Sequence, residues 1–338
     1  MTPFLHDLGH QASALGDFCA WYRRPGATEP IGVVRPRRIL LTGMGASFHA
    51  ALWGSLVLRS LGISATAIES SELLHHGLVL IEDADALVMI SQSGASAEVA
   101  PLLDRLPADK PVLGVTNDPD SALGRRASVH LHIAAGAEAA VACKTYLNTL
   151  AALWLTAHLW GGHDPEEPLG QIDAVAGRIA ALTEDADRIG AEWCERLLGL
   201  DKIVFTGHGP HVPTARQGAM MMAEWMKREA LGLGIGAFRH GFIEFTDAAT
   251  GVVALGAGGA TDASVTLLTG ELRSFGATVV NVVEGRIVGP DENANRELPE
   301  PLSALLDVVP MQIFVEAAAR RLGIAPTFRH IGKVIARI

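Results

Sequence analysis

Short apolar runs alternate along the chain with longer amphipathic stretches. Three runs rich in β-branched and aliphatic residues lie in the first half, RILLTGMG from Arg38, ALVMISQSGAS from Ala86 and PVLGVTND from Pro111. The stretches between them have the spacing of helices. Continuous apolar strands separated by helices are typical of parallel strands that are covered on both faces. The pattern predicts an α/β fold with a doubly wound sheet.

The same series occurs a second time. KIVFTGHG from Lys202 matches RILLTGMG at an offset of 164 residues, and the apolar runs from Gly251 and Thr278 match the other two at offsets of 165 and 167. Nearly constant offsets indicate two copies of one supersecondary unit. We therefore expect two doubly wound, flavodoxin-like parallel-sheet domains in tandem, with helices on both faces.

A mostly helical region joins the two series. Residues 139–200 read as helical, apart from GGHDPEEP at 161–168, where glycine and proline end one helix and start another. This break predicts a first domain over 1–165 and a second over 166–338. An N-terminal helix before Arg24 and a C-terminal helix over 302–322 should flank the sheets, followed by the tail FRHIGKVIARI.

Composition and charge exclude several classes of protein. The chain has 338 residues, 49% of them hydrophobic and 19% charged, with a formal net charge of −10. A net anion without a basic patch is a poor binder of nucleic acid or membrane surfaces. Three cysteines without CxxC spacing suggest neither a disulfide framework nor a zinc site. The start MTPFLHDLGH has no secretory pattern, so we expect a cytoplasmic globular protein.

Two loops that follow predicted strands carry the candidate chemistry. The first loop places Gly45 and Ser47 at the turn between the strand from Arg38 and the helix that follows it. The second loop follows the strand from Ala86 and carries four polar side chains, Ser91, Gln92, Ser93 and Ser96. In parallel sheets, ligands bind beyond the carboxyl ends of strands, where free N–H groups at helix starts favour anions. Hydroxyls, an amide and backbone N–H groups suit a phosphate monoester.

Two other interpretations of these loops stay open. Glycine and serine are also ordinary turn and N-cap residues, although two such loops in one unit favour a site. The matching positions of the second half read GAGGAT with one hydroxyl, so the first domain should bind and the second support it. GMGASFHA with Glu69 could also be a dinucleotide fingerprint, but its third glycine is missing.

These motifs resemble the sugar isomerase (SIS) family, in the double-SIS arrangement of the isomerase half of glutamine:fructose-6-phosphate amidotransferase. The resemblance covers nearly the whole chain: TGMGASFHA and SQSGASAEV resemble its phosphate loops, and AEAAVACKT resembles a further sugar-site segment. From the last segment, Glu138 and Val141 are expected to line the sugar. QGAMMMAEWMKREALGLGIGAFRHG and RHIGKVIARI resemble its catalytic segments.

The resemblance implies three catalytic residues. Glu224 matches the carboxylate that moves a proton between sugar carbons 1 and 2, His240 the histidine that opens the ring, and Lys333 the lysine that forms a Schiff base. A carboxylate base, a near-neutral imidazole and an amine suit aldose–ketose interconversion. Each of the three, taken alone, is more often an ordinary solvated helix, loop or tail residue, and only the resemblance favours a catalytic role.

Departures from the family pattern limit the expected reaction. Met221 replaces a second catalytic lysine, and no cysteine nucleophile or glutaminase domain precedes the sugar part, so glutamine-dependent amination is not expected. Met44 and Ala46 replace Cys and Thr, and CKT at 143–145 replaces STK. The nature of the sugar and the effect of Met221 stay open.

The sequence therefore predicts a phosphosugar isomerase or aminosugar-phosphate deaminase that acts on a hexose 6-phosphate or its amino derivative. It predicts no metal and no cofactor. A fructose-amine 6-phosphate deglycase and a non-catalytic, sugar-phosphate-sensing regulator remain alternatives. The resemblance also implies a homodimer whose active site is shared between subunits, with the donor of His240 undecided.

Overall fold

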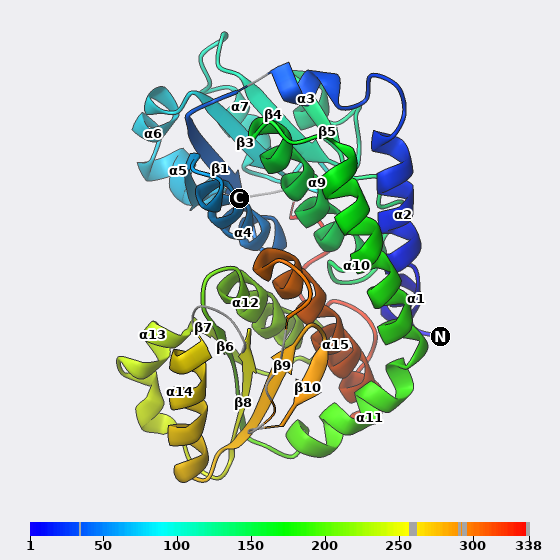
Figure 1. The fold of residues 1–338 in the computed structure, drawn as a ribbon, viewed down its shortest axis with the longest axis vertical. Coiled ribbons are helices and arrows are strands. Elements are labelled where there is room, and N and C mark those ends of the chain that lie inside the picture. Colours follow the sequence, from blue (N-terminus) through cyan, green and yellow to red (C-terminus); the bar gives the residue numbers. More distant parts are fainter. Residues whose placement is uncertain (34, 257–261, 290–291, 293–295, 336–338) are drawn as a thin grey trace. The chain divides into compact units, whose positions relative to one another are not determined.

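The computed structural model describes residues 1–33, 35–256, 262–289, 292 and 296–335, and these form two compact units. We call one the first-sheet unit, which comprises His10–Gly177 and Phe328–Ile338. The other, the second-sheet unit, comprises Met1–Gly9 and Arg178–Thr327. Figure 1 shows both units.

Five parallel strands form the first sheet. They are β1 (Arg38–Gly43), β2 (Ser64–Glu69), β3 (Ala86–Ile90), β4 (Val112–Thr116) and β5 (Val129–His132). Their order is β2-β1-β3-β4-β5, so the chain crosses from one side of β1 to the other between β2 and β3. This is the flavodoxin-like order, in which the switch point lies between β1 and β3.

Helices cover both faces of the first sheet. The unit contains α2 (Gln11–Tyr22), α3 (Glu29–Val33), α4 (Ala46–Ser60), α5 (Ser70–His76), α6 (Val79–Asp83), α7 (Val99–Leu103), α8 (Ala122–Arg126) and α9 (Lys144–Trp160). One face of the sheet packs in a single apolar core with α5 to α8. On the other face lie α4 and α9, since Gly54 of α4 approaches both Leu41 of β1 and Leu153 of α9.

The second sheet has the order β10-β9-β8-β6-β7. Its strands are β6 (Lys202–Gly207), β7 (Leu231–Gly234), β8 (Thr250–Leu255), β9 (Thr278–Val283) and β10 (Arg286–Val288). The first four are parallel, and β10 returns antiparallel to β9 through a tight turn. The switch point of this sheet lies between β6 and β8, the strands that correspond to β1 and β3.

The second sheet is covered in the same way. Its unit contains α1 (Pro3–Gly9), α11 (Ala186–Leu197), α12 (His211–Met221), the π-helical η1 (Met222–Met226), α13 (Ile235–Arg239), the 3-10 helix η2 (Phe242–Phe245), α14 (Asp262–Ser274) and α15 (Glu300–Arg321). Figure 1 shows α13 and α14 on one side of the strands and α15 on the other. Val204 and Val252 pack with the first pair, whereas Phe205 approaches Gly218 of α12.

Helix α15 is long and apolar enough to span a membrane. Every residue in its most apolar window is nevertheless buried within the protein. Its contacts with α11 and α12 place it in the core of the second-sheet unit. The hydropathy of α15 is therefore that of a core helix.

The tandem α/β architecture predicted from the sequence is confirmed, and the division between the compact units differs from the predicted boundary. The units divide between Gly177 and Arg178, inside α10 (Glu166–Glu184), rather than at 165/166. The Gly-Pro segment does end α9, but α10 continues without interruption from one unit into the other. The C-terminal tail belongs to the first-sheet unit, because Lys333 and Ile335 contact residues of that unit.

Candidate active site

The two predicted phosphate loops lie side by side at the first switch point. β1 and β3 are neighbouring parallel strands, so the loops that follow Gly43 and Ile90 leave the same edge of the sheet. In doubly wound sheets this crevice is the usual ligand site.

Close packing and helix geometry shape the first loop. A Cβ on Gly43 would lie 2.7 Å from the Ser47 carbonyl carbon, so a larger residue there would push Ser47 away. Gly45 has φ +53° and is the N-cap of α4. The side chain of Ser47 is therefore presented, half-buried, in the first turn of a 15-residue helix, where N–H dipoles favour an anion.

The second loop is a tight turn fixed from behind by β4. Gly94 N donates to Ser91 O at 2.9 Å, and Gln92 O accepts from Thr116 Oγ1 and Asn117 N. The Ser91 and Ser96 hydroxyls are 2.9 Å apart. Ser91 is 3% exposed, whereas Gln92, Ser93 and Ser96 are half-buried. Ser91 therefore supports the turn, and the other three side chains remain accessible to a ligand.

Glu138 and Lys333 meet inside the first-sheet unit, although 195 residues separate them. Lys333 Nζ donates to Glu138 Oε2 and to Ala140 O, both at 2.7 Å. The Glu138 carboxylate, whose side chain is fully buried, also accepts from Cys143 N, Thr145 N and Thr145 Oγ1. It therefore holds the start of α9 and the tail together.

The tail is also bound to the second phosphate loop. Ala97 N donates to Ile335 O at 3.0 Å, directly after the loop serines. Lys333 thus lies on a segment that runs from the serine loop to the segment around Glu138. Val141, which we expected to line the sugar, is 1% exposed and is covered by protein in this conformation.

Glu224 lies in the second-sheet unit within η1, one turn of wide helix that follows α12. Lys227 and Arg228 both donate their backbone N–H to Met222 O, and Lys227 has φ +56°. The side chain of Glu224 is half-buried. Single π turns in α-helices occur frequently at functional sites.

His240 is exposed and directly follows α13. Glu224 precedes the amino end of β7, whereas His240 lies beyond the carboxyl end of that strand. The four residues of β7 span roughly 10–13 Å. Along the chain, β7 and α13 therefore lie between these two predicted catalytic residues.

At the switch point of the second sheet, the loop that follows β6 differs from the corresponding loop after β1. His211 occupies the position that corresponds to Ser47, and its ring is 1% exposed, 3.3 Å from the buried Asp307. Burial raises the pKa of the Asp307 carboxyl and lowers that of His208 in the same loop. The imidazole of His211 packs against Gly256 at the end of β8, where an added Cβ would lie 2.3 Å from the ring. The corresponding second loop, residues 257–261 of GAGGAT, lies outside the described residues.

Two residues that support the site were not singled out from the sequence. Asn117 bonds through its amide to Gly136 O and Ala135 N, and so fixes the segment that leads to Glu138. Thr145 donates to the Glu138 carboxylate at 2.6 Å. Asn117 could have been found, because it follows the strand-like run PVLGVT at the same edge of the sheet.

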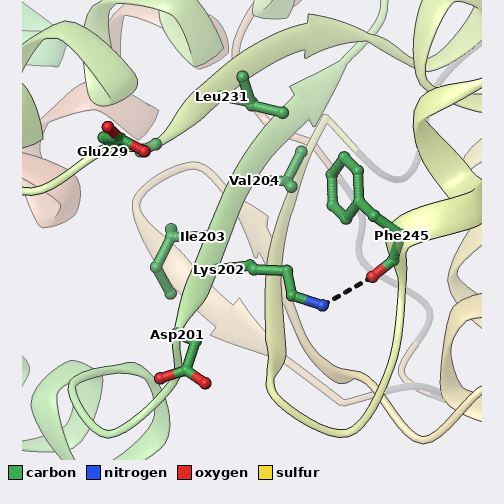
Figure 2. A pocket seen from close by; sticks show the side chains of 8 residues that line it. Asp201, Lys202, Ile203, Val204, Glu229, Leu231 and Phe245 are labelled. Carbon is green, nitrogen blue, oxygen red and sulfur yellow. Dashed lines mark hydrogen bonds between the residues drawn. The ribbon is translucent and has the colours of Figure 1, made fainter.

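A cavity of about 280 Å³ lies elsewhere, at the amino ends of β6 and β7 (Figure 2). Apolar side chains line most of it, with Asp201 and Glu229 at its margin, and Lys202 Nζ donates to Phe245 O at 2.8 Å. None of the predicted site residues lines this cavity, which opens at the sheet edge opposite the switch point.

Fold and loops together define the chain as a tandem α/β protein with two polar loops at one switch point. Residues 33–159 match the SIS domain family. They are a SIS domain, which confirms the family resemblance of the sequence motifs.

A curated protein is similar along nearly the whole chain. The glutamine–fructose-6-phosphate aminotransferase of Methanothermobacter thermautotrophicus is 28% identical over 335 residues, 95% of this chain and 55% of its own length. The chain thus spans about half the length of this curated relative.

Solved structures show the same fold. Glucosamine-6-phosphate deaminase of Thermotoga maritima superposes with a TM-score of 0.78 at 22% identity, over 99% of both chains. Tagatose-6-phosphate ketose/aldose isomerase of Escherichia coli superposes with a TM-score of 0.81 at 19% identity, over 98% of this chain and 96% of its own. The whole chain therefore shares the tandem α/β fold of these two structures.

Proposed function

We propose that this protein interconverts or deaminates a hexose 6-phosphate or its 2-amino derivative. The observation that carries the proposal is the pair of polar loops at the β1/β3 switch point, bound to the tail that presents Lys333. Ser47, Gln92, Ser93 and Ser96 with the N–H groups of the turns suit a phosphate monoester. The names of the similar proteins, all phosphosugar enzymes, support the same substrate class.

In the proposed reaction Glu224 removes a proton from carbon 2 of the open-chain sugar and returns it to carbon 1. The intermediate is an enediol, or an enolamine when the substrate carries nitrogen. His240 opens the ring by moving a proton at the ring oxygen, and Lys333 faces the carbonyl. Isomerisation needs no co-reactant, whereas deamination consumes one water and releases ammonia.

We also propose a homodimer with shared sites. Because β7 separates Glu224 from His240 within one chain, a second copy that supplies His240 would complete the acid–base pair. Closed two-fold dimers are the commonest form of homo-oligomer.

The test is a substrate panel read by NMR and an ammonia assay. Fructose 6-phosphate, glucosamine 6-phosphate and a fructose-amine 6-phosphate are incubated separately with the protein. Isomer or ammonia formation supports the proposal, and release of an amino acid identifies a deglycase. Binding without turnover of any of the three indicates a regulator, and a thermal shift with NAD but not with sugar phosphate indicates a dinucleotide site.

Glu224→Gln tests the assigned base. The amide keeps the shape of the side chain but cannot take the carbon-bound proton, so kcat should fall by about 100-fold or more. The affinity for sugar phosphate, measured by calorimetry, should change little. An unchanged kcat would exclude Glu224 as the base.

A further inference from the structure

A carboxylate is buried directly behind η1. Glu316 of α15 is 1% exposed and accepts from Trp225 Nε1 at 2.7 Å and from Thr2 Oγ1 at 2.5 Å. Burial of a carboxylate costs free energy unless hydrogen bonds compensate for the lost water. One of these compensating bonds goes to the residue next to Glu224.

Packing fixes the indole of Trp225 as well. Trp225 is 2% exposed, and its ring meets the edge of Phe4 at a centroid distance of 5.3 Å and an interplanar angle of 72°. The Nε1 group therefore has one defined direction, toward Glu316. Any rotation of η1 about its axis would break this bond.

The backbone of η1 is held at several points. Met222 O accepts from both Lys227 and Arg228, and the Arg228 guanidinium donates to Leu198 O at 3.0 Å and Leu200 O at 3.2 Å. Lys227 adopts a left-handed conformation that is uncommon for residues other than glycine. Wide turns and strained residues persist only where their surroundings determine them.

We propose that Glu316 is a positioning residue, which fixes η1 through Trp225 Nε1 and so sets the direction of the Glu224 carboxylate. The inference rests on the proposed role of Glu224. Without the bond to Glu316, η1 can relax toward an ordinary α-helical turn. Such a change shifts the residues of η1 around the helix axis and moves the carboxylate away from the sugar carbons.

Steady-state kinetics of four variants test the link. Glu316→Leu and Trp225→Phe each remove the hydrogen bond, and each should lower kcat by about 10- to 100-fold with KM within about twofold, because small misplacements of a reacting group are costly. Glu316→Gln should retain kcat within about threefold, since its amide oxygen still accepts from the indole. The double variant Trp225→Phe/Glu316→Leu should be no slower than either single variant.

Trp193→Phe is the matched control. Trp193 is also buried, at 1% exposure, and packs on Phe314 of the same α15, 5.8 Å between ring centroids. Three outcomes would overturn the proposal. The control could lose as much kcat as Trp225→Phe, or folded Glu316→Leu could keep an unchanged kcat. In the third outcome, the kcat losses of the two single variants multiply in the double variant.

Amide hydrogen exchange tests the link between Glu316 and η1 without an activity measurement. In Glu316→Leu, exchange at Lys227 and Arg228 should rise about tenfold or more as η1 opens, but not in Trp193→Phe. Unchanged exchange overturns the positioning role. If exchange rises in Glu316→Leu but the unchanged protein turns over no phosphosugar, the link between Glu316 and η1 is upheld. Only the proposed function is then excluded.

Discussion

At the scale of single residues, the polar loops depend on glycines that no other residue replaces without cost. Gly94 illustrates this dependence, because two requirements meet there. Its φ is +59°, and a Cβ would lie 2.0 Å from Ser121 Oγ. The loop serines are presented to a ligand only while this turn keeps its shape.

Gly94→Ala should therefore lower stability by more than the roughly 1–2 kcal/mol expected from backbone strain alone, and weaken sugar-phosphate binding. The matched control is Gly62→Ala, at φ +78° with no atom within 4 Å of the added Cβ, which incurs strain without a clash. Urea unfolding and calorimetry measure the two effects. Equal losses in both variants would contradict the role of the Ser121 contact.

The individual site residues differ in how far the sequence alone could place them. Ser47, Ser93 and Ser96 follow strands that a hydrophobic pattern predicts, so their common edge could be foreseen. The burial of Glu138 and Val141 could not, because exposure depends on what packs over a segment. Glu138, expected to line the sugar, has its carboxylate occupied by the start of α9 and by Lys333.

At the scale of elements, Lys333 and Ile335 attach the tail to the first-sheet unit. Its described contacts include Ile335 O with Ala97 N and Lys333 Nζ with Glu138 and Ala140. The Glu138 carboxylate is thus the group that joins the tail to the start of α9.

Glu138→Gln should release the tail. The amide cannot accept all four donors, and buried donors left unpaired cost about 1–3 kcal/mol. Trypsin should then cleave after Lys333 several times faster than in the unchanged protein, as followed by mass spectrometry. Glu82→Gln, at an exposed position in α6, is the control. Equal cleavage rates in all three proteins would show that Glu138 does not hold the tail.

At the scale of the whole molecule, one buried and two half-buried histidines couple stability to pH. Burial lowers the pKa of His130, His132 and His158 from the ordinary value of 6.5. Below pH 6.5 the unfolded chain therefore binds protons that the folded protein excludes.

The contribution of these histidines to the free energy of unfolding should be greatest above pH 6.5 and fall as the pH drops below that value. Urea titrations between about pH 5 and pH 8 measure this slope. His132→Asn, which removes one of the three groups, should reduce the slope. A slope that is unaffected by this substitution would contradict the assignment.

The proposed shared site makes a further prediction for the assembled molecule. Glu224→Gln and His240→Asn should each be inactive alone. When equal amounts of the two variants are mixed and exchange subunits, half of the dimers are hybrids, and each hybrid has one intact site of its two. About a quarter of the activity of the unchanged protein should therefore return. No recovery despite proven exchange would show that each chain supplies its own His240.

The amino-acid sequence by itself determined the strands, their tandem order and the polar loops, because these depend on local hydrophobic periodicity and on glycine and serine at strand ends. Only the tertiary structure decided which unit receives the tail, that His211 lies buried at the second switch point, and that Glu316 meets Trp225. The last pair is 91 residues apart in the chain, and Lys333 lies 195 residues from Glu138. Contacts of this kind have no local pattern, since they form only when the packing of whole elements brings distant side chains together.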